Sequence, residues 1–467
     1  MSSAKTFLQI DPSIAISHSG DEKSLAHPTA RTRWPKIVAS AIADVDKTNC
    51  AADRSTAEVE DGNRVLADLH RLLLDMENDQ PMRLLPEDGA GDIQVFNDEL
   101  ELLGPITWHN SPWLFTECYL YRLIQTCFSR RATTYWKNYD VFAQQKERGL
   151  TDSKTSIVEL VQFLHRATDA SQSSFPMSDG DLKALFEEML QVSLWGNSVD
   201  LLLLVHLSAE ELRSRQGMQA RQSFKENVVD DDTEDVWQIL STLKDSVHTR
   251  EIHIVLDNAG FELLSDLVFV AYLLDANYAS RIVLHGKAFS WFVSDATAQD
   301  LDFTIKTLKD ASFSGDITDK EATELRKFGT SLALNLQSGK LRYEFNPFWT
   351  TQHCYARMPE YAPDLWAQLG QGDLIIFKGD LNYRKLVFDG LWPRTTTFQH
   401  ALGKLGELPN EKQSGIRLLS LRTCKADTVV GLAPGKEEEL DPEGTGEWSR
   451  NGKYAVISYY DGKPRGK

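Results

Sequence analysis

The sequence predicts an α/β protein: a C-terminal α/β/α sandwich with a mainly parallel, doubly wound sheet, preceded by a helical domain. From Glu251 onward, short apolar runs rich in β-branched residues alternate with helix-like segments, as in buried parallel strands joined by crossover helices. Before Glu251, apolar residues recur at helical spacing. We therefore expect a loosely ordered segment over residues 1–31, a helical domain over 32–190 and the α/β domain over 191–467.

The helical half is predicted element by element from its apolar spacing. Its first helix begins at Trp34, because Pro35 suits a first helical turn. Further helices are predicted over residues 53–75, 113–126, 156–170 and 179–194.

Polar residues interrupt the helical half at two notable places. Glu117 is the one acid in an apolar helix, so it either pairs with Arg122, faces solvent or faces a site. Asn197 follows Gly196 between two predicted helices, where the pair forms either a helix cap and turn or part of a site.

After the helical half, the acidic run 230–235 is expected to be a solvated helix start.

In the α/β half, strands are predicted over residues 252–256, 281–285, 373–378, 416–421 and 454–460. The first of these strands organises the site. Asp257 and Asn258 follow it directly, Gly260 gives the loop its freedom, and a helix starts at Phe261. Open α/β sheets bind ligands at the carboxyl ends of their strands, and two side-chain oxygens there suit a hard divalent cation. Alternatively, Asp257 caps the helix and Asn258 shapes the turn.

Other strand ends carry the remaining polar groups. Asp295 lies ten residues beyond His285, where a loop can return it to the sheet. Asp380, Asn382, Arg384 and Lys385 follow the third strand, and Arg422, Thr423 and Lys425 follow the fourth. Acids on two segments and cations on two others are what metal-assisted phosphoryl transfer needs, since oxygen ligands hold the metal and cations hold the phosphate.

Composition limits the partners. The 467 residues carry 50 basic and 68 acidic side chains, a net charge of −18, which argues against nucleic acid as the main partner. An anionic substrate would need a local metal or cation cluster. Five scattered cysteines suit a reducing compartment. No secretory signal or membrane span is visible, so we expect a cytoplasmic location, with the nucleus as a second one, and no membrane partner.

Three familiar sites are poorly supported. GLAPGKE, residues 431–437, lacks the spacing and the hydroxyl residue of a phosphate loop. The first strand is not followed by the glycine pattern of a dinucleotide site. A covalent aspartyl-phosphate would need a second acid two residues after Asp257, where Ala259 stands.

Several longer motifs carry a family resemblance. They are WLFTECYLYR, LWGNSVDLLLL, VLDNAGFELLSDL, FVSDAT, GDLIIFKGDLNYRKL and RTCK. Together they resemble the damage-control phosphatases over residues 34–460, and an RTxK box is the hallmark of subfamily III. One branch of that subfamily carries the older label acidic-residue, or protein-glutamate, O-methyltransferase.

The resemblance implies a metal-dependent phosphatase of sugar phosphates such as fructose 1-phosphate and fructose 6-phosphate. The implied role is metabolite damage control, with a metal-activated water as the nucleophile. By motif position, the implied metal ligands are Asp257, Asn258 and Asp295, with Asp257, Asn258 and Lys425 catalytic. The implied substrate contacts are Asp380, Leu381, Asn382, Tyr383, Arg384 and Lys425, with Glu117 and Asn197 as further candidates. Glu262 matches an S-adenosylmethionine position, and Arg422 lies in the RTxK box.

The expected cofactor is a divalent metal, Mn²⁺ or Ni²⁺, with Co²⁺ and Mg²⁺ as further candidates. The alternative activity is S-adenosylmethionine-dependent methylation of protein carboxylates. It usually requires a glycine-rich first loop, which Asn258-Ala259-Gly260 does not provide. A third alternative is a non-enzymatic scaffold built from the helical half.

Overall fold

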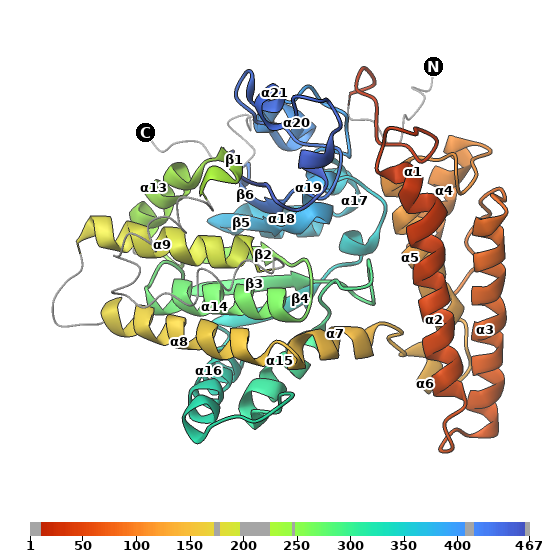
Figure 1. Ribbon diagram of the computed structural model, residues 1–467, viewed down its shortest axis with the longest axis horizontal. Coiled ribbons are helices and arrows are strands. Elements are labelled where there is room, and N and C mark those ends of the chain that lie inside the picture. Colours follow the sequence, from red (N-terminus) through yellow and green to blue (C-terminus); the bar gives the residue numbers. More distant parts are fainter. Residues whose placement is uncertain (1–10, 172–177, 197–224, 245–247, 407–414, 463–467) are drawn as a thin grey trace.

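The computed structural model describes residues 11–171, 178–196, 225–244, 248–406 and 415–462 (Figure 1). Its centre is a seven-stranded sheet in the order β1-β7-β6-β5-β2-β3-β4. The strands are β1 (Val228–Asp231), β2 (Glu251–Val255), β3 (Arg281–Gly286), β4 (Leu341–Phe345), β5 (Leu374–Lys378), β6 (Arg417–Thr423) and β7 (Ala455–Asp461). Neighbouring strands are parallel except β6 and β7. The predicted mainly parallel α/β fold is confirmed.

The strand order reverses beside β2. From β2 the chain builds outward through β3 to β4, and then returns to place β5 on the other side of β2 and β6 beyond it. The carboxyl ends of β2 and β5 therefore flank the switch point of the sheet, which is where open α/β folds bind ligands.

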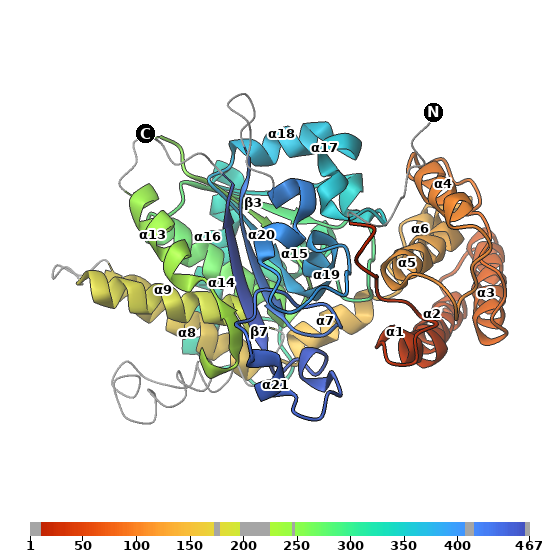
Figure 2. The same cartoon turned by 90° about the horizontal axis from the view of Figure 1, so that it is seen from above.

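Alternating side chains of β2 enter two different cores, because successive residues of a strand point to opposite faces. Ile252 and Ile254 pack in one hydrophobic cluster, and Val255 packs in the other. Helices cover both faces: α8, α9, α13 and α14 lie on one side and α17 to α20 on the other (Figure 2).

On the first face the helices are α7 (Ala143–Thr151), α8 (Lys154–Ser171), α9 (Asp179–Leu194), α13 (Thr233–Lys244), α14 (Phe261–Asp275), α15 (Ala298–Asp310) and α16 (Asp319–Ser338). On the second face they are α17 (Met358–Tyr361), α18 (Pro363–Gln371), α19 (Gly379–Leu386) and α20 (Phe398–Ala401), with 3₁₀ turns η3 (Pro347–Thr350), η4 (Tyr355–Arg357) and η5 (Gly403–Gly406). Near the C-terminus lie α21 (Lys436–Leu440) and η6 (Glu447–Ser449).

The N-terminal helices form their own core, set apart from the sheet in Figures 1 and 2. They are α1 (Ala26–Pro28), the π-helical turn η1 (Thr29–Arg33), α2 (Trp34–Asn49), α3 (Thr56–Glu77), α4 (Ile93–Leu103), α5 (Trp113–Ser129) and α6 (Thr134–Lys137). Ser55 and Glu58 start α3 with a capping box, since each side chain accepts from the other's backbone N–H. Trp291 and Leu381, from the α/β half, also enter this core.

The packing divides the chain differently from the sequence-based boundary at residue 190. Helices α8 and α9 share the hydrophobic cluster of α14 and the sheet, whereas α2 to α5 belong to the separate N-terminal core. The helical pattern of α8 and α9 gave no sign of this, because an apolar face has the same period whichever layer it packs against.

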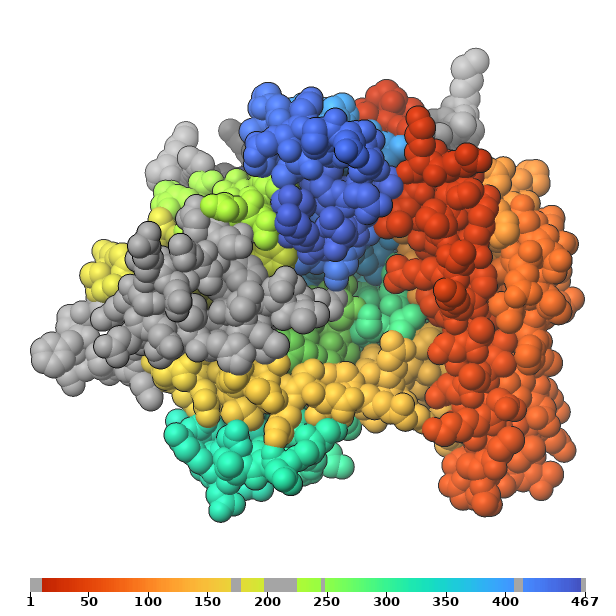
Figure 3. All heavy atoms as spheres, in the orientation of Figure 1, coloured from red at the N-terminus to blue at the C-terminus, as the bar shows by residue number. Residues whose placement is uncertain are grey.

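Within the described part of the N-terminal segment, residues 11–31, hydrogen bonds reach distant parts of the chain. Ser17 N donates to Asp389 O at 3.1 Å, and Ser24 Oγ donates to Asp427 Oδ2 at 2.6 Å. Figure 3 shows this red N-terminal segment lying against the blue C-terminal part. Hydrogen bonds to distant segments order this stretch although it forms no long helix or strand.

The two outer strands were not foreseen. The acidic run predicts a helix start over residues 230–235, but β1 continues to Asp231, and α13 begins only at Thr233. Asp230 Oδ2 accepts a hydrogen bond from Ser458 Oγ of β7 at 2.5 Å. An edge strand is short and carries charges, so β1 and β4 lack the apolar runs that revealed the central strands.

Candidate active site

Asp257 and Asn258 lie directly after β2, at the switch point of the sheet. Helix α14 starts after Gly260, which has a φ of 70° and provides no side-chain cap. The interpretation of Asp257 as the cap of this helix is therefore wrong. Across the switch point, Gly379 (φ 82°) brings its backbone against the Asp257 carboxyl, and a Cβ at that position would lie 1.8 Å from Asp257 Oδ2. Only glycine allows this approach.

Asp295 reaches the same place by a sharp turn between β3 and α15. Two backbone hydrogen bonds, of 2.7 and 2.8 Å, tie residues 294–296 to residues 257–259. Phe292 and Val293 make the turn with φ values of 46° and 71°. A β-branched residue rarely adopts this left-handed conformation, so the surrounding structure must hold the loop in place. The expected return of Asp295 to the first strand is confirmed.

Buried lysines accompany these acids. Lys287 Nζ, just after β3, lies 3.2 Å from Asp295 Oδ2. Lys378 Nζ, at the end of β5, lies 3.0 Å from Asp266 Oδ1 and 3.8 Å from Glu262 Oε1 on α14. Each lysine fixes the direction of a carboxylate beside the switch point.

A third buried lysine, Lys385, comes from α19. Its Nζ donates to the carbonyl of Thr351 at 2.6 Å and to that of Trp349 at 3.4 Å. Desolvation lowers the pKa of Lys385. Its charge in turn lowers the pKa of Asp295, which places it within electrostatic range of the acids.

Burial and mutual repulsion raise the pKa values of the acids. The pKa of Asp257 lies well above its ordinary value because the carboxyl is desolvated and faces the charges of Glu262 and Asp295. Burial also raises the pKa of Asp295 to about 6, although Lys287 opposes the shift. Carboxylates held this close with incomplete compensation suit a divalent cation, which would favour their charged forms.

The donor atoms fit such a cation in part. Asn258 Nδ2 donates to Asp257 Oδ2 at 2.9 Å and to Glu262 Oε2 at 2.8 Å, and its Oδ1 accepts from Ser294 Oγ. The amide would have to turn over to offer its oxygen to a metal. Within the described part of the chain, no three acids, histidines or cysteines form a ready set of metal ligands. The fit therefore depends on Asp257 and Asp295 together with a rotated Asn258.

The run Asp380 to Arg384 opens α19, and its side chains diverge. Leu381 enters the N-terminal core and Tyr383 enters the core of the second sheet face. Asn382 is buried, and its Nδ2 donates to backbone carbonyls at the ends of β2 and β5 at 2.7 to 3.3 Å. These three residues anchor the helix, and only part of the run remains near the switch point.

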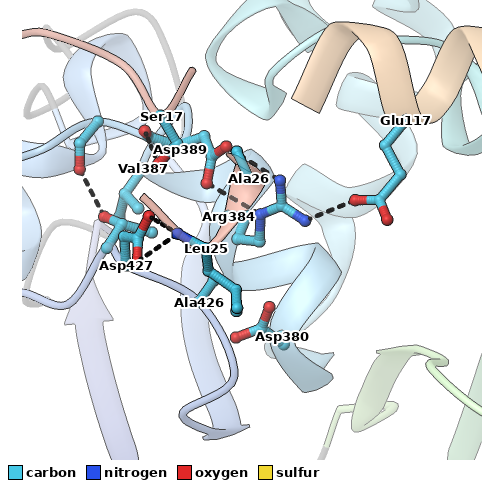
Figure 4. A network of polar contacts seen from close by, with 12 residues as sticks. Ser17, Leu25, Ala26, Glu117, Asp380, Arg384, Val387, Asp389, Ala426 and Asp427 are labelled. Carbon is cyan, nitrogen blue, oxygen red and sulfur yellow. Dashed lines mark hydrogen bonds and ion pairs between the residues drawn. The ribbon is translucent and has the colours of Figure 1, made fainter. Parts of the chain in front are cut away.

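Arg384 faces the helical half (Figure 4). Its Nη1 donates to Glu117 Oε2 at 3.0 Å, and Nε and Nη2 donate to the two oxygens of Asp389 at 2.9 and 3.0 Å. The guanidinium carbon lies 3.9 Å from the centre of the Trp113 ring. Pairing of Glu117 with Arg122 is therefore wrong, since Arg122 binds two aspartates of the helical half instead.

The RTCK loop is shaped by Asp380. Arg422 Nε donates to Asp380 Oδ1 at 2.8 Å, and the backbone N–H of Lys425 donates to the same oxygen at 3.1 Å. Arg422 is fully buried over the Tyr383 ring, 4.3 Å from its centre. The half-buried Lys425 lies near enough to lower the pKa of Asp257. Arg422 thus orders the loop, and Lys425 lies within electrostatic range of Asp257.

The structure brings together Asp257, Asn258, Asp295, Glu262 and Lys425. Asn197 lies outside the described residues, which stop at Gly196 beside α14. Lys287 and Lys378 are not among the site residues expected from the sequence, whereas Lys385 is one of the polar residues expected after the third strand. The first two stand at the carboxyl ends of β3 and β5, so their position was a usable signal.

Comparison with known proteins identifies the family. The model of the damage-control phosphatase ARMT1-like domain matches residues 29–440. The chain belongs to this family. Damage-control phosphatase ARMT1 of Xenopus tropicalis is 34% identical over 461 residues, covering 96% of this chain and 99% of the relative. The mouse protein of the same name is 33% identical over 456 residues (94% and 97%), and the human one is 32% identical over 454 residues (94% and 97%).

A more distant likeness is to the crystal structure of a DUF89 family protein from Pyrococcus horikoshii. Its TM-score is 0.39 at 14% identity, covering 92% of this chain and 96% of that one. Because the chain belongs to this family, it is a damage-control phosphatase. None of the helices described here has the length and apolar character needed to cross a membrane.

Proposed function

We propose that this chain hydrolyses phosphomonoesters of small sugars, such as fructose 1-phosphate and fructose 6-phosphate, with a divalent metal. The proposed ion is Mn²⁺ or Ni²⁺, with Co²⁺ or Mg²⁺ as a substitute, and oxygen ligands by type suit Mn²⁺ and Mg²⁺. The observation that carries this proposal is that two buried acids, Asp257 and Asp295, share the β2/β5 switch point with the cation Lys425. Acids for a metal and a cation for a phosphate are the parts that phosphoryl transfer to water requires.

The side chains divide the work in this proposal. Asp257, Asp295 and a rotated Asn258 would hold the metal, which would supply polarisation of a phosphate oxygen and a water. Lys287 keeps Asp295 in position. Lys425 binds the phosphate oxygens and stabilises charge that develops on them. The Oδ2 atom of Asp380, which has no partner among the described residues, accepts from a sugar hydroxyl.

The proposal is tested by removing the metal and by changing one ligand. Chelator-treated protein should release no phosphate from fructose 1-phosphate until Mn²⁺ or Ni²⁺ is added back. Asp257→Asn should lower kcat/KM by at least about 1000-fold. It should keep or raise the melting temperature of the metal-free protein, because it removes a buried, repelled carboxyl. Asp302→Asn, at an exposed acid of α15, is the matched control. Full activity after metal removal would contradict the proposal.

The methyltransferase alternative is separable by binding. Glu262, the residue that the resemblance links to S-adenosylmethionine, is already engaged by Asn258 and lies 3.8 Å from Lys378. Calorimetry with S-adenosylmethionine and no metal distinguishes the two activities. Micromolar binding would favour the methyltransferase, and no binding favours the phosphatase.

A further inference from the structure

An open cavity of about 580 Å³ lies between the N-terminal helices and the second face of the sheet. One wall comes from the α4 and α5 region, and the other from residues 346–365. Asp257, Asp295 and Lys425 do not line it, so the cavity is distinct from the candidate active site. Its volume is in the range of small-molecule sites.

Acids dominate the charged lining of this cavity. Arg122 is clamped between Asp88 and Asp92 by four hydrogen bonds of 2.7 to 3.0 Å. One guanidinium shared by two carboxylates leaves one negative charge, and the exposed Asp364 adds another. The described lining contains no lysine and no second arginine. An anion would therefore be repelled here.

A buried histidine also lines the cavity. His353 is 2% exposed, and neither of its ring nitrogens has a hydrogen-bond partner among the described residues. Glu99 Oε2, which accepts from Gln352, is 3.8 Å from Nδ1, too far for a hydrogen bond. Burial and the nearby Arg357 charge lower the pKa of His353 to about 3, so the ring is neutral and offers one accepting nitrogen. A buried polar group without a partner is costly unless a ligand or water completes it.

Aromatic rings complete the walls. The half-buried Phe289 lines the cavity, and Phe348 and Tyr361 line it from the segment 346–365. The Tyr361 ring centre is 4.0 Å from that of His353. Aromatic faces next to carboxylates attract an organic cation, because the ring faces and the acids are both electron-rich.

We propose that this cavity binds a small organic cation, an ammonium or amidinium group on a short apolar or aromatic body. The cation lies between the Asp88/Asp92 pair and Asp364, one of its N–H groups donates to His353, and its body packs on the aromatic walls. The proposal does not depend on phosphatase activity, because the cavity shares none of the residues proposed to hold metal or phosphate.

The test uses the full chain and three matched probes of one shape: phenethylammonium, 2-phenylethanol and phenylacetate. Isothermal titration should show the ammonium binding at least about tenfold more tightly than the alcohol, and no binding of the carboxylate. Asp364→Asn, an isosteric change of an exposed side chain, should weaken the ammonium about three- to tenfold. Glu360→Gln, which removes an exposed acid that does not line the cavity, should leave it unchanged.

Two results would overturn the proposal. One is equal binding, or no binding, of the ammonium and the alcohol at millimolar concentration. The other is unchanged ammonium binding in Asp364→Asn. Asp257→Asn should still bind phenethylammonium. This variant therefore tests the cation site separately from the phosphatase activity. A crystal soaked with the ammonium should show it beside Phe289 and Tyr361.

Discussion

Lys425 is the residue whose position says most about the proposed chemistry. Its backbone is fixed by Asp380, yet no described carboxylate forms an ion pair with its Nζ, and its charge reaches Asp257. A fixed loop with an available ammonium group is suited to a phosphate. By contrast, Arg384 already holds Glu117 and Asp389, so it is better understood as a residue that positions α19.

We predict that Lys425→Ala reduces transition-state stabilisation by about 2–4 kcal/mol, as loss of a charged oxyanion donor does. Metal affinity should hardly change, since the amine is not a ligand. Steady-state kinetics with metal titration measures both. Lys453→Ala, at an exposed lysine on the same connection between β6 and β7, is the control. Near-normal kcat/KM, or loss of the metal, would show that Lys425 has a different role.

For single residues, the sequence predicts the site role of those that stand at the ends of apolar strands. It does not predict the role of residues that is set by a contact with a distant partner. Asp257 and Lys425 were predictable because each follows a run that must be a buried strand. The partner of Glu117 was not, since Arg384 is 267 residues away and no local rule connects them. The orientation of the Asn258 amide is also set by a distant group, Ser294.

Among the elements, α19 depends on the glycine that begins it. Gly379→Ala would place a methyl group 1.8 Å from Asp257 Oδ2 and require an unfavourable φ of 82°. We expect about 2–4 kcal/mol of destabilisation and at least a 100-fold loss of kcat/KM, because the carboxyl must move. Denaturant unfolding and phosphate release measure these effects. Gly149→Ala in α7, where a Cβ meets nothing within 4 Å, should leave activity unchanged.

The edge strand β1 should make stability depend on pH. Burial and two neighbouring aspartates raise the pKa of Asp230 to about 7, from an ordinary value near 3.8. Between these values the unfolded chain ionises while the folded one keeps its proton, so this residue's effect on stability becomes more unfavourable as pH rises, and levels off above 7. The full effect is reduced because the side chain retains some contact with solvent.

Asp230→Asn should therefore raise the free energy of unfolding by about 1–2 kcal/mol at pH 8 and change it little at pH 4. The amide oxygen can still accept from Ser458. Urea denaturation at the two pH values measures the difference. A gain of the same size at both would mean that the charge of Asp230 is not the cause.

For the whole molecule, the connection between the helical half and the sheet is polar as well as apolar. Arg384 joins Glu117 of α5 to Asp389 beyond α19, and all three are buried. The N-terminal segment adds Ser17 to the same cluster through the Asp389 carbonyl (Figure 4). A buried ion pair that loses one partner leaves the other charge uncompensated.

We predict that Glu117→Gln lowers the free energy of unfolding by about 2–3 kcal/mol, because Arg384 keeps only Asp389. Differential scanning calorimetry should show the helical half unfolding before the sheet, as two transitions. Glu60→Gln, from an exposed pair on α3, should change neither midpoint by more than about 1 °C. A single, unshifted transition in Glu117→Gln would argue against this coupling.

The sheet order also constrains how the protein is made. In the described sheet β1 pairs only with β7, and β7 follows it at residue 455, so β1 leaves the ribosome long before its partner exists. The strands β2, β3 and β5 are synthesised before β6 and β7 and can assemble first. Because synthesis runs from the N-terminus, the segments that carry Asp257 and Asp295 can reach their places early. The loop that carries Lys425, between β6 and β7, is placed late. A nascent chain waiting for β7 displays an open strand edge, which is the interval in which a chaperone would be most useful.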